Sequence, residues 1–290
     1  MRLPNLPKKL PLSLARWKPH IQRINLHAHR TWLRLVSPVQ NLDRLLQKAA
    51  QPGSCTNISL HLLRRKLGDD LYLNIPARAL TLCIRRLTNP VAPRDHVLGY
   101  FILDEDWQKY HQDIRKTFIY EETAALVQNP EAIRESAWYK KTLANIAAGR
   151  YMLRHRKLLT TQEALDDYLN LCGKLLASVR AKGLLRLSGL DAEQRNAYQG
   201  ATRQSSWEDA EVDLGLAVNA AGDVYRTADG QHRGALAVIL NLPSIPVELR
   251  LTRRDWLRAA LAKRPDLRPT DALRLAIRDL ESDLQSKFGR

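Results

Sequence analysis

The sequence predicts an α+β protein with short strands set among helices, a largely helical N-terminal portion and two helices at the C-terminal end. Three observations lead to this fold class. Residues 212–227 alternate apolar and polar side chains around a turn at 219–223, which is typical of a β-hairpin. Residues 232–241 then follow a helical pattern, and "SIPVELRL" at 244–251 is typical of a strand. Elsewhere, apolar residues recur every three or four positions, which indicates helices.

Residues 1–40 are expected to form a basic arm. They contain eight Lys and Arg residues, and no Asp or Glu precedes Asp43. Pro4, Pro7 and Pro11 favour extended or irregular backbone near the start of the chain. Such an arm can lie on an anionic membrane surface, bind phosphates or simply extend into solvent, and the sequence leaves these three roles open.

Residues 41–159 are expected to be a mostly helical N-terminal region. A helical pattern ends at Pro52, and alternation around residues 71–75 suggests short strands. Helical periodicity then runs over residues 107–148.

Residues 160–252 are predicted to be one domain, and residues 253–290 to be two C-terminal helices. Thr161 is placed to cap a helix that ends near Gly183. Thr270 is placed to cap the last helix of the chain. An apolar stripe on that helix predicts core packing first and a dimer face second; its members are Leu273, Ile277, Leu280 and Leu284.

A candidate anion site lies in the segment Asp229–Arg233, at the start of the helix that follows the hairpin. Gly230 lets the backbone approach a ligand closely, and a helix start favours bound anions. Arg233 offers a bidentate guanidinium and His232 a second donor, while Gln231 lies between them and Gly230. Asp229 offers a carboxylate that could hold Mg²⁺ or orient a nucleophile. The alternative is a capped turn in which Arg233 pairs with Asp229.

The segment "ADGQHRGALAVILNLPSIPVEL", after the hairpin and the helix end "LLASVRAKGL", resembles the ParB/sulfiredoxin superfamily. The resemblance covers residues 166–252 and implies a small mixed sheet with helices that binds a nucleotide. The region from "VLGYFILDEDWQKY" onward is similar, more loosely, to ParB-like proteins found among polysaccharide-assembly enzymes. Those proteins carry a Gly-Asp-Trp-Asp motif, of which this chain keeps Asp106 and Trp107 but has Gln108 in the last place.

The resemblance implies several activities, and the loop residues help to separate them. A sulfiredoxin needs a cysteine where this chain has Gln231, so that activity is not expected. A partition clamp carries "GERR" in this loop and a helix-turn-helix after it, which residues beyond 252 do not suggest. DNA or RNA binding through the basic surface, without catalysis, remains the alternative function.

The preferred hypothesis is an ATP-dependent phosphotransferase that acts on a small-molecule or glycan acceptor. In it, Gly230, Gln231, His232 and Arg233 bind the phosphates of ATP or CTP, and Asp229 serves Mg²⁺ and catalysis. Three acidic residues just before the hairpin are candidate bases, with a solvated acidic turn as the alternative for each: Glu208, Asp209 and Glu211.

Composition limits the location and the partners. The net charge of +16 favours polyanions such as nucleic acid, anionic lipid headgroups or phosphorylated glycans. Three widely spaced cysteines indicate reduced thiols, and no stretch has the length of a membrane span or the pattern of a signal peptide. We therefore expect a cytoplasmic protein, with peripheral contact at the inner face of a membrane as a further expectation. The sequence leaves the oligomeric state open.

Overall fold

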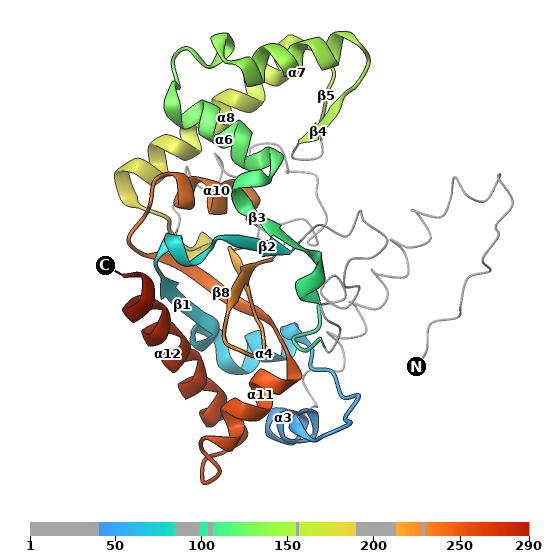
Figure 1. Cartoon of the computed structure of the whole chain (residues 1–290), viewed down its shortest axis with the longest axis vertical. Helices are drawn as coiled ribbons and strands as arrows, with labels where there is room; N and C mark the ends of the chain where they lie inside the picture. Colours follow the sequence, from blue (N-terminus) through green and yellow to red (C-terminus); the bar gives the residue numbers. More distant parts are fainter. Residues whose placement is uncertain are drawn as a thin grey trace, which may run out of the picture.

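The structure is a computed structural model that describes residues 41–84, 99–103, 107–154, 157–189, 213–227 and 230–289. It is a mixed α+β fold, as the sequence predicts (Figure 1). The α-helices in these ranges are α3 (Leu42–Ala50), α4 (Leu60–Leu67), α6 (Phe118–Gln128), α7 (Ala137–Ala147), α8 (Gln162–Lys182), α10 (Gln231–Ile239), α11 (Arg254–Ala262) and α12 (Pro269–Phe288). The strands are β1 (Tyr72–Ile75), β2 (Leu82–Ile84), β3 (His111–Asp113), β4 (Met152–Arg154), β5 (Lys157–Leu159), β6 (Gly215–Val218), β7 (Val224–Arg226) and β8 (Ile245–Thr252).

Six strands form one mixed sheet in the order β1-β8-β6-β7-β2-β3. The long strand β8 pairs antiparallel with β1 and parallel with β6. The expected hairpin is β6 and β7, in which Val218 pairs with Val224. Its turn is stabilised by Asn219, whose side-chain oxygen accepts hydrogen bonds from the backbone N–H groups of Ala221 and Asp223.

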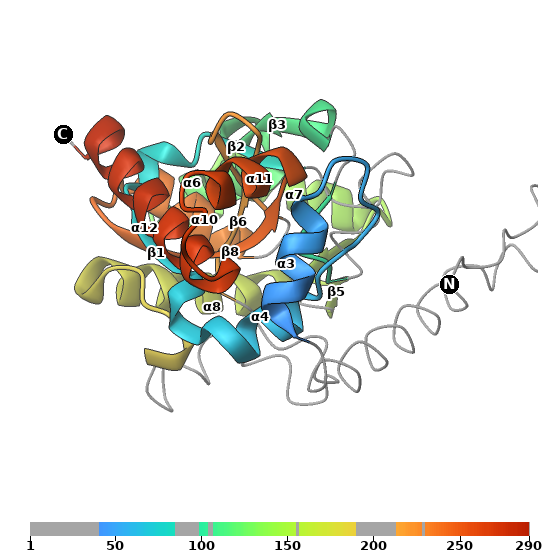
Figure 2. The same cartoon turned by 90° about the horizontal axis from the view of Figure 1, so that it is seen from below.

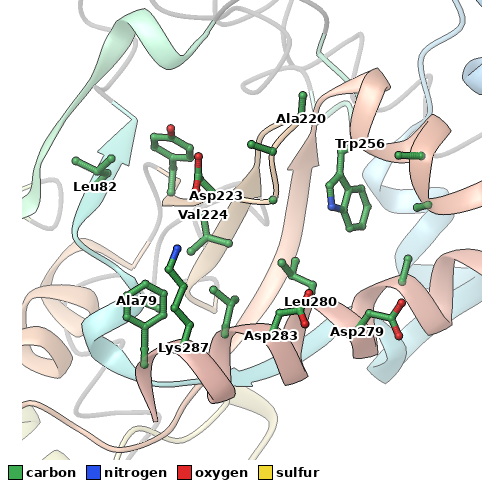
Figure 3. Close-up of a pocket in the computed structure, with 18 of the residues that line it drawn as sticks. Ala79, Leu82, Ala220, Asp223, Val224, Trp256, Asp279, Leu280, Asp283 and Lys287 are labelled. Atoms are coloured by element: carbon green, nitrogen blue, oxygen red, sulfur yellow. The ribbon is translucent and has the colours of Figure 1, made fainter. Parts of the chain in front are cut away.

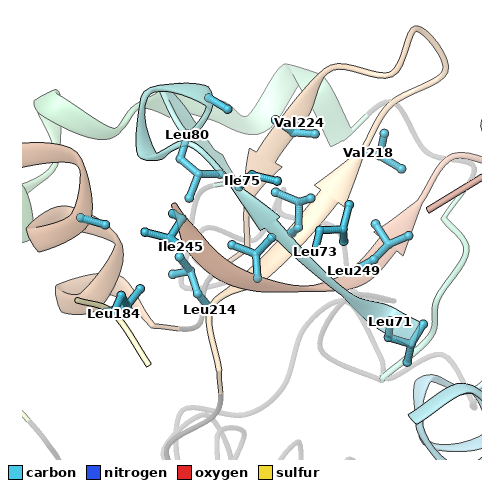
Figure 4. Close-up of a cluster of buried hydrophobic side chains, with 14 of the residues drawn as sticks. Leu71, Leu73, Ile75, Leu80, Leu184, Leu214, Val218, Val224, Ile245 and Leu249 are labelled. Carbon is cyan, nitrogen blue, oxygen red and sulfur yellow. The ribbon is translucent and has the colours of Figure 1, made fainter. Parts of the chain in front are cut away.

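The main hydrophobic core lies on one face of this sheet (Figure 4). Seen from below, α3, α11 and α12 lie side by side, and all three pairs of these helices are in contact (Figure 2). The predicted apolar stripe of α12 is buried in this core, so its role in packing is confirmed: Leu273, Ile277, Leu280 and Leu284. Helix α12 also covers the edge of the sheet, because Glu281 accepts from the Asn74 N–H and Gln285 donates to the Asn74 carbonyl.

A bulge in β8 divides the strand between two hydrophobic clusters. The register with β6 shifts after Leu249, so Leu249 packs in the main core while Leu251 joins a second cluster. In that second cluster Trp107 is fully buried, and its ring meets the edge of Tyr225 with the ring centroids 5.1 Å apart. The tryptophan singled out by the sequence therefore packs in the core.

Helices α6, α7 and α8 form a separate layer with the β4–β5 hairpin, in the upper part of Figure 1. Each helix begins at a Ser or Thr whose hydroxyl accepts a hydrogen bond from the third residue along: Thr117, Ser136 and Thr161. Helix α10 packs against α6 and lies between this layer and the sheet. The start of α10 is therefore bordered by both parts of the protein.

Two expectations need correction. The sheet joins strands from residues 72–113 to strands from 215–252, so the boundary expected at residue 160 separates strands that are hydrogen-bonded to each other. The strand expected around residues 71–75 is confirmed as β1, and residues 60–67 before it form helix α4. The expected helix over 107–148 is broken by β3 and again after Asn129, where Pro130 cannot continue the hydrogen-bonding pattern.

The start and the cap of α12 also differ from the sequence prediction in detail. Arg268 is the N-cap residue, and Pro269 takes the first helical position. Thr270 instead donates from its backbone N–H and its hydroxyl to Asp43, at 2.8 and 2.7 Å. Cys83 and Cys172 are buried and Cys55 is exposed, and none of the three forms a disulfide.

Candidate functional site

The start of α10 has the backbone that the sequence predicts. Gly230 is its N-cap and has a φ of 64°, in the left-handed region. A Cβ added to Gly230 would lie 3.0 Å from Leu214 Cδ1 and 3.2 Å from the Leu214 backbone. Glycine is therefore required here both by backbone conformation and by the close approach of the β6 side of the hairpin.

The expected site residues fall into two groups. Asp229, Glu208, Asp209 and Glu211 lie outside the described residues. Of the loop residues that are described, Gln231 and His232 are half-buried and Arg233 is fully buried.

The buried side chain of Arg233 contacts other parts of the protein. Its side chain is 1 % exposed, and its Nη1 lies 3.3 Å from Asp213 Oδ1. Its Nη2 donates to the backbone carbonyl of Leu185, just beyond the end of α8. To bind a phosphate directly, as expected, this guanidinium would have to exchange both contacts.

Asp213 connects Arg233 to a cavity of about 340 Å³. The Asp213 carboxylate accepts hydrogen bonds from the Tyr72 hydroxyl at 2.9 Å and from the Leu187 N–H at 2.8 Å. The residues that line the cavity are mostly charged or polar: Arg64, Gly68, Asp69, Tyr72, Leu187, Asp213, Glu248 and Arg250. An open cavity lined mostly by polar residues is therefore linked to the first turn of α10 through Asp213 and Arg233.

Glu248 and two arginines form the charged wall of this cavity. Arg64 donates from Nε and Nη2 to the two carboxylate oxygens of Glu248, at 2.5 and 2.7 Å. Arg250 donates from Nε to the same carboxylate at 2.6 Å and from Nη2 to the Asp213 carbonyl at 2.7 Å. Burial alone would raise the pKa of Glu248, but the Arg64 hydrogen bond and the charges of both arginines outweigh it and lower the pKa.

Two further features shape the cavity wall. Gly215 leaves room for Arg250, because a Cβ there would lie 2.7 Å from Arg250 Cδ and 2.1 Å from Thr227 Oγ1. Burial, together with the negative charges of Glu248 and Asp213, raises the pKa of Tyr72 to about 12. The Tyr72 hydroxyl therefore stays protonated and can donate a hydrogen bond at neutral pH.

The His232 side chain does not line the polar cavity and instead contacts the helical layer. Its Nε2 lies 2.7 Å from the Tyr168 hydroxyl of α8 and 3.2 Å from Glu122 Oε1 of α6. Tyr168 also donates to Glu122, and Arg154 of β4 lies 3.0 Å from the other oxygen of that carboxylate. The imidazole is thus fixed by a buried carboxylate, in the arrangement that orients catalytic and phosphate-binding histidines.

Sequence reasoning found the start of α10 but missed the partners of its side chains. Glu122 and Tyr168 lie 110 and 64 residues from His232 along the chain. Glu248 and Arg250 gave a usable signal, because charged residues within the apolar strand "IPVELRL" are rarely buried unless they are paired. Within the described ranges, no group of three or more His, Cys, Asp and Glu side chains is placed to hold a metal ion.

A larger cavity, of about 520 Å³, lies between α11, α12 and the β6–β7 turn (Figure 3). Trp256 and Leu280 contribute apolar walls, and Lys287, Asp279 and Asp283 contribute charges of both signs. Asp279 is already paired with Arg264, at 2.6 Å. Asp213, which joins the polar cavity to Arg233 of α10, does not line this larger cavity, so the two cavities are distinct.

Comparison of the chain with models of known protein families, with curated proteins and with solved structures finds no match. None of the described helices is both long enough and apolar enough to cross a bilayer.

Proposed function

We propose that this protein is a nucleotide-binding phosphotransferase whose nucleotide phosphates bind at the start of α10 and in the adjoining polar cavity. One observation carries the proposal: a left-handed glycine opens α10 beside a cavity that contains two arginines and is linked to the helix through Arg233 and Asp213. The resemblance of this loop to ParB/sulfiredoxin proteins leads to the same class of ligand.

The cavity suits a phosphorylated ligand in size, and its wall contains two guanidinium groups. Its volume falls within the range of about 300–1,000 Å³ that is common for small-molecule sites. Arg64 is the exposed member of the charged wall, and its guanidinium can turn from Glu248 to phosphate oxygens without losing its bidentate geometry. Arg250 stays with Glu248 and the Asp213 carbonyl, and the wall also holds the carboxylates of Asp69, Asp213 and Glu248, so Arg64 is the cation that would meet the phosphate.

Phosphoryl transfer needs positioning and charge stabilisation more than covalent chemistry by the protein. In the proposed site, the first turn of α10 and Arg64 hold the phosphates, while His232 stays bound to Glu122 and Tyr168 in the helical layer. Mg²⁺ bound with the nucleotide would neutralise part of the phosphate charge. Its expected ligand Asp229 and the expected bases at 208, 209 and 211 lie outside the described residues.

Calorimetry with ATP, CTP and ADP in the presence of Mg²⁺ tests the proposal. Arg64→Ala is expected to weaken binding by about ten- to hundredfold, because it removes a charge-assisted bidentate contact. The matched control is Arg65→Ala, since Arg65 is the exposed next residue of α4 and does not line the cavity. Absence of binding by all three nucleotides, or equal losses in the two variants, would reject the proposed site.

Salt dependence separates this function from nucleic-acid binding, the alternative that the net charge suggests. Binding to phosphates of duplex or single-stranded nucleic acid weakens steeply as salt is added, because counterions are released. Tight, salt-sensitive nucleic-acid binding without any affinity for free nucleotides would favour the alternative.

A further inference from the structure

The β4–β5 hairpin has one buried face and one exposed apolar face. Leu153 and Leu158 are directly opposite each other across the two strands, and they are 62 % and 50 % exposed. Tyr151, which precedes β4 on the same side of the alternating strand, is 47 % exposed. We name these three residues, Tyr151, Leu153 and Leu158, the outer face of the hairpin.

The inner face is already occupied by the protein. Leu159 is buried, and Met152, its partner across the strands, packs against the main core. Arg154 lies over the Phe118 ring and pairs with Glu122. The hairpin is therefore held in place by its inner face, and its outer leucines are left exposed.

The chain around the hairpin is basic. Residues 136–162 contain no Asp or Glu. Three basic side chains of this segment are exposed: Lys140, Lys141 and Arg150. Arg156 belongs to the same stretch of sequence, although it lies outside the described residues. Apolar side chains within an acid-free basic segment are typical of surfaces that bind anionic lipid.

We propose that the outer face of the hairpin docks on an anionic lipid bilayer. The two leucines would enter the boundary between headgroups and acyl chains, Tyr151 would lie at the level of the headgroups, and the basic residues would pair with lipid phosphates. The hairpin lies beside α7 in the upper part of Figure 1, whereas α3 and α11 lie at the lower end of the molecule.

Other occupants fit this surface less well. Binding to single-stranded nucleic acid depends on aromatic side chains that stack on bases, and two of the three outer-face residues are aliphatic. A second copy paired through the same hairpin would bring the two acid-free basic segments together, at an electrostatic cost. The combination of exposed leucines and positive charge favours lipid.

Docking would also place the membrane close to the candidate site. Arg154 leaves the inner face of the hairpin to bind Glu122, and Glu122 contacts His232 at the start of α10. The membrane-facing hairpin is therefore connected to that helix start through two side chains. The docking proposal itself does not depend on nucleotide binding, which is measured separately.

Sedimentation of the full chain with vesicles tests the proposal. Wild-type protein is expected to bind phosphatidylcholine vesicles that contain about a third phosphatidylserine far better than pure phosphatidylcholine vesicles. The double variant Leu153→Ser with Leu158→Ser should bind the anionic vesicles at least about tenfold more weakly, because two apolar side chains no longer enter the bilayer. Leu158→Trp should bind as tightly as wild type or more tightly.

A matched control is available at the other end of the molecule. Leu267 and Leu275 are 42 % and 43 % exposed, so Leu267→Ser with Leu275→Ser removes as many exposed leucines away from the hairpin. This variant should bind vesicles like wild type, and thermal unfolding should show that all variants are folded. Full binding by the hairpin variant would assign any membrane contact to other residues, such as the basic arm, and overturn the proposal. Equal losses in the hairpin and control variants, or equal wild-type binding to neutral vesicles, would overturn it as well.

Discussion

Arg233, on the first turn of α10, places its guanidinium 3.3 Å from the carboxylate of Asp213, just ahead of β6. Both side chains are buried, and the pair connects the helix start to the wall of the polar cavity. The arginine that the sequence singled out as a phosphate ligand is thus held by internal contacts, and the phosphate site that we propose is the adjoining cavity.

Arg233→Ala should destabilise the protein. The substitution leaves a buried carboxylate without its partner, which typically costs about 3–5 kcal/mol in the free energy of unfolding. Urea unfolding measures this cost. Arg134→Ala is the control, because Arg134 makes an exposed pair with Asp166 that is worth less than about 1 kcal/mol. If Arg233→Ala kept wild-type stability and lost only nucleotide affinity, Arg233 would be a ligand that the buried pair does not constrain.

Gly230→Val and Gly230→Asn should differ in severity. Valine is strained at a φ of 64°, and its Cβ would lie 3.0 Å from a Leu214 methyl group. Asparagine tolerates the left-handed region better, so it suffers mainly from the contact with Leu214. We expect Gly230→Val to lower the melting temperature more than Gly230→Asn, and both to weaken nucleotide binding. Equal melting temperatures for the two variants would mean that backbone conformation does not limit this position.

Gly215→Ala should destabilise the protein and disturb the cavity. The new Cβ would lie 2.1 Å from Thr227 Oγ1 and 2.7 Å from Arg250 Cδ, and overpacking of this kind typically costs about 1–3 kcal/mol. Gly173→Ala is the opposite case, since Gly173 lies inside α8 with open space around its Cβ position. That substitution should stabilise the helix by about 0.5–1 kcal/mol. Denaturant unfolding measures both effects. If the two substitutions changed the free energy of unfolding in the same direction, this reasoning would be wrong.

Tyr72 should make the protein less stable at high pH. Its pKa of about 12 in the folded protein exceeds the ordinary value of 10.0, so between these two pH values the unfolded chain loses its proton while the folded chain retains it. Stability is therefore full below about pH 10 and declines toward pH 12, at up to about 1.4 kcal/mol per pH unit for one group. The difference in unfolding free energy between wild type and Tyr72→Phe should shrink over this interval. A constant difference from pH 9 to pH 12 would show that Tyr72 titrates alike in both states.

Much of the region from α8 to α12 could be predicted from sequence because its signals are local. The hairpin turn, the glycine before α10 and the apolar stripe of α12 each depend on residues that are close together in the sequence. Helix α4 was missed because "LHLLRRKL" is short, and short apolar runs fit helix and strand about equally well. The break between α6 and α7 had a usable signal in Asn129 and Pro130.

The candidate site was predictable only in part. Its backbone, at Gly230, follows from a local motif. The side chains that surround it come from distant segments, since Arg64 and Glu248 are 184 residues apart and Arg154 of β4 reaches Glu122 of α6. A single sequence does not show which charged side chains come into contact in the folded protein. Neither the cavity nor the contacts of His232 with Glu122 and Tyr168 could therefore be derived from it.

The pairing of β1 with β8 also sets the order in which the protein can be completed during synthesis. Tyr72 is opposite Glu248 in this ladder, so β1 leaves the ribosome long before its partner strand has been translated. Its apolar residues Leu73 and Ile75 must wait for the last fifty residues of the chain, which also supply α11 and α12. Closing such a long loop is slow, and a nascent chain that stalls before β8 would expose this strand to chaperones or to aggregation.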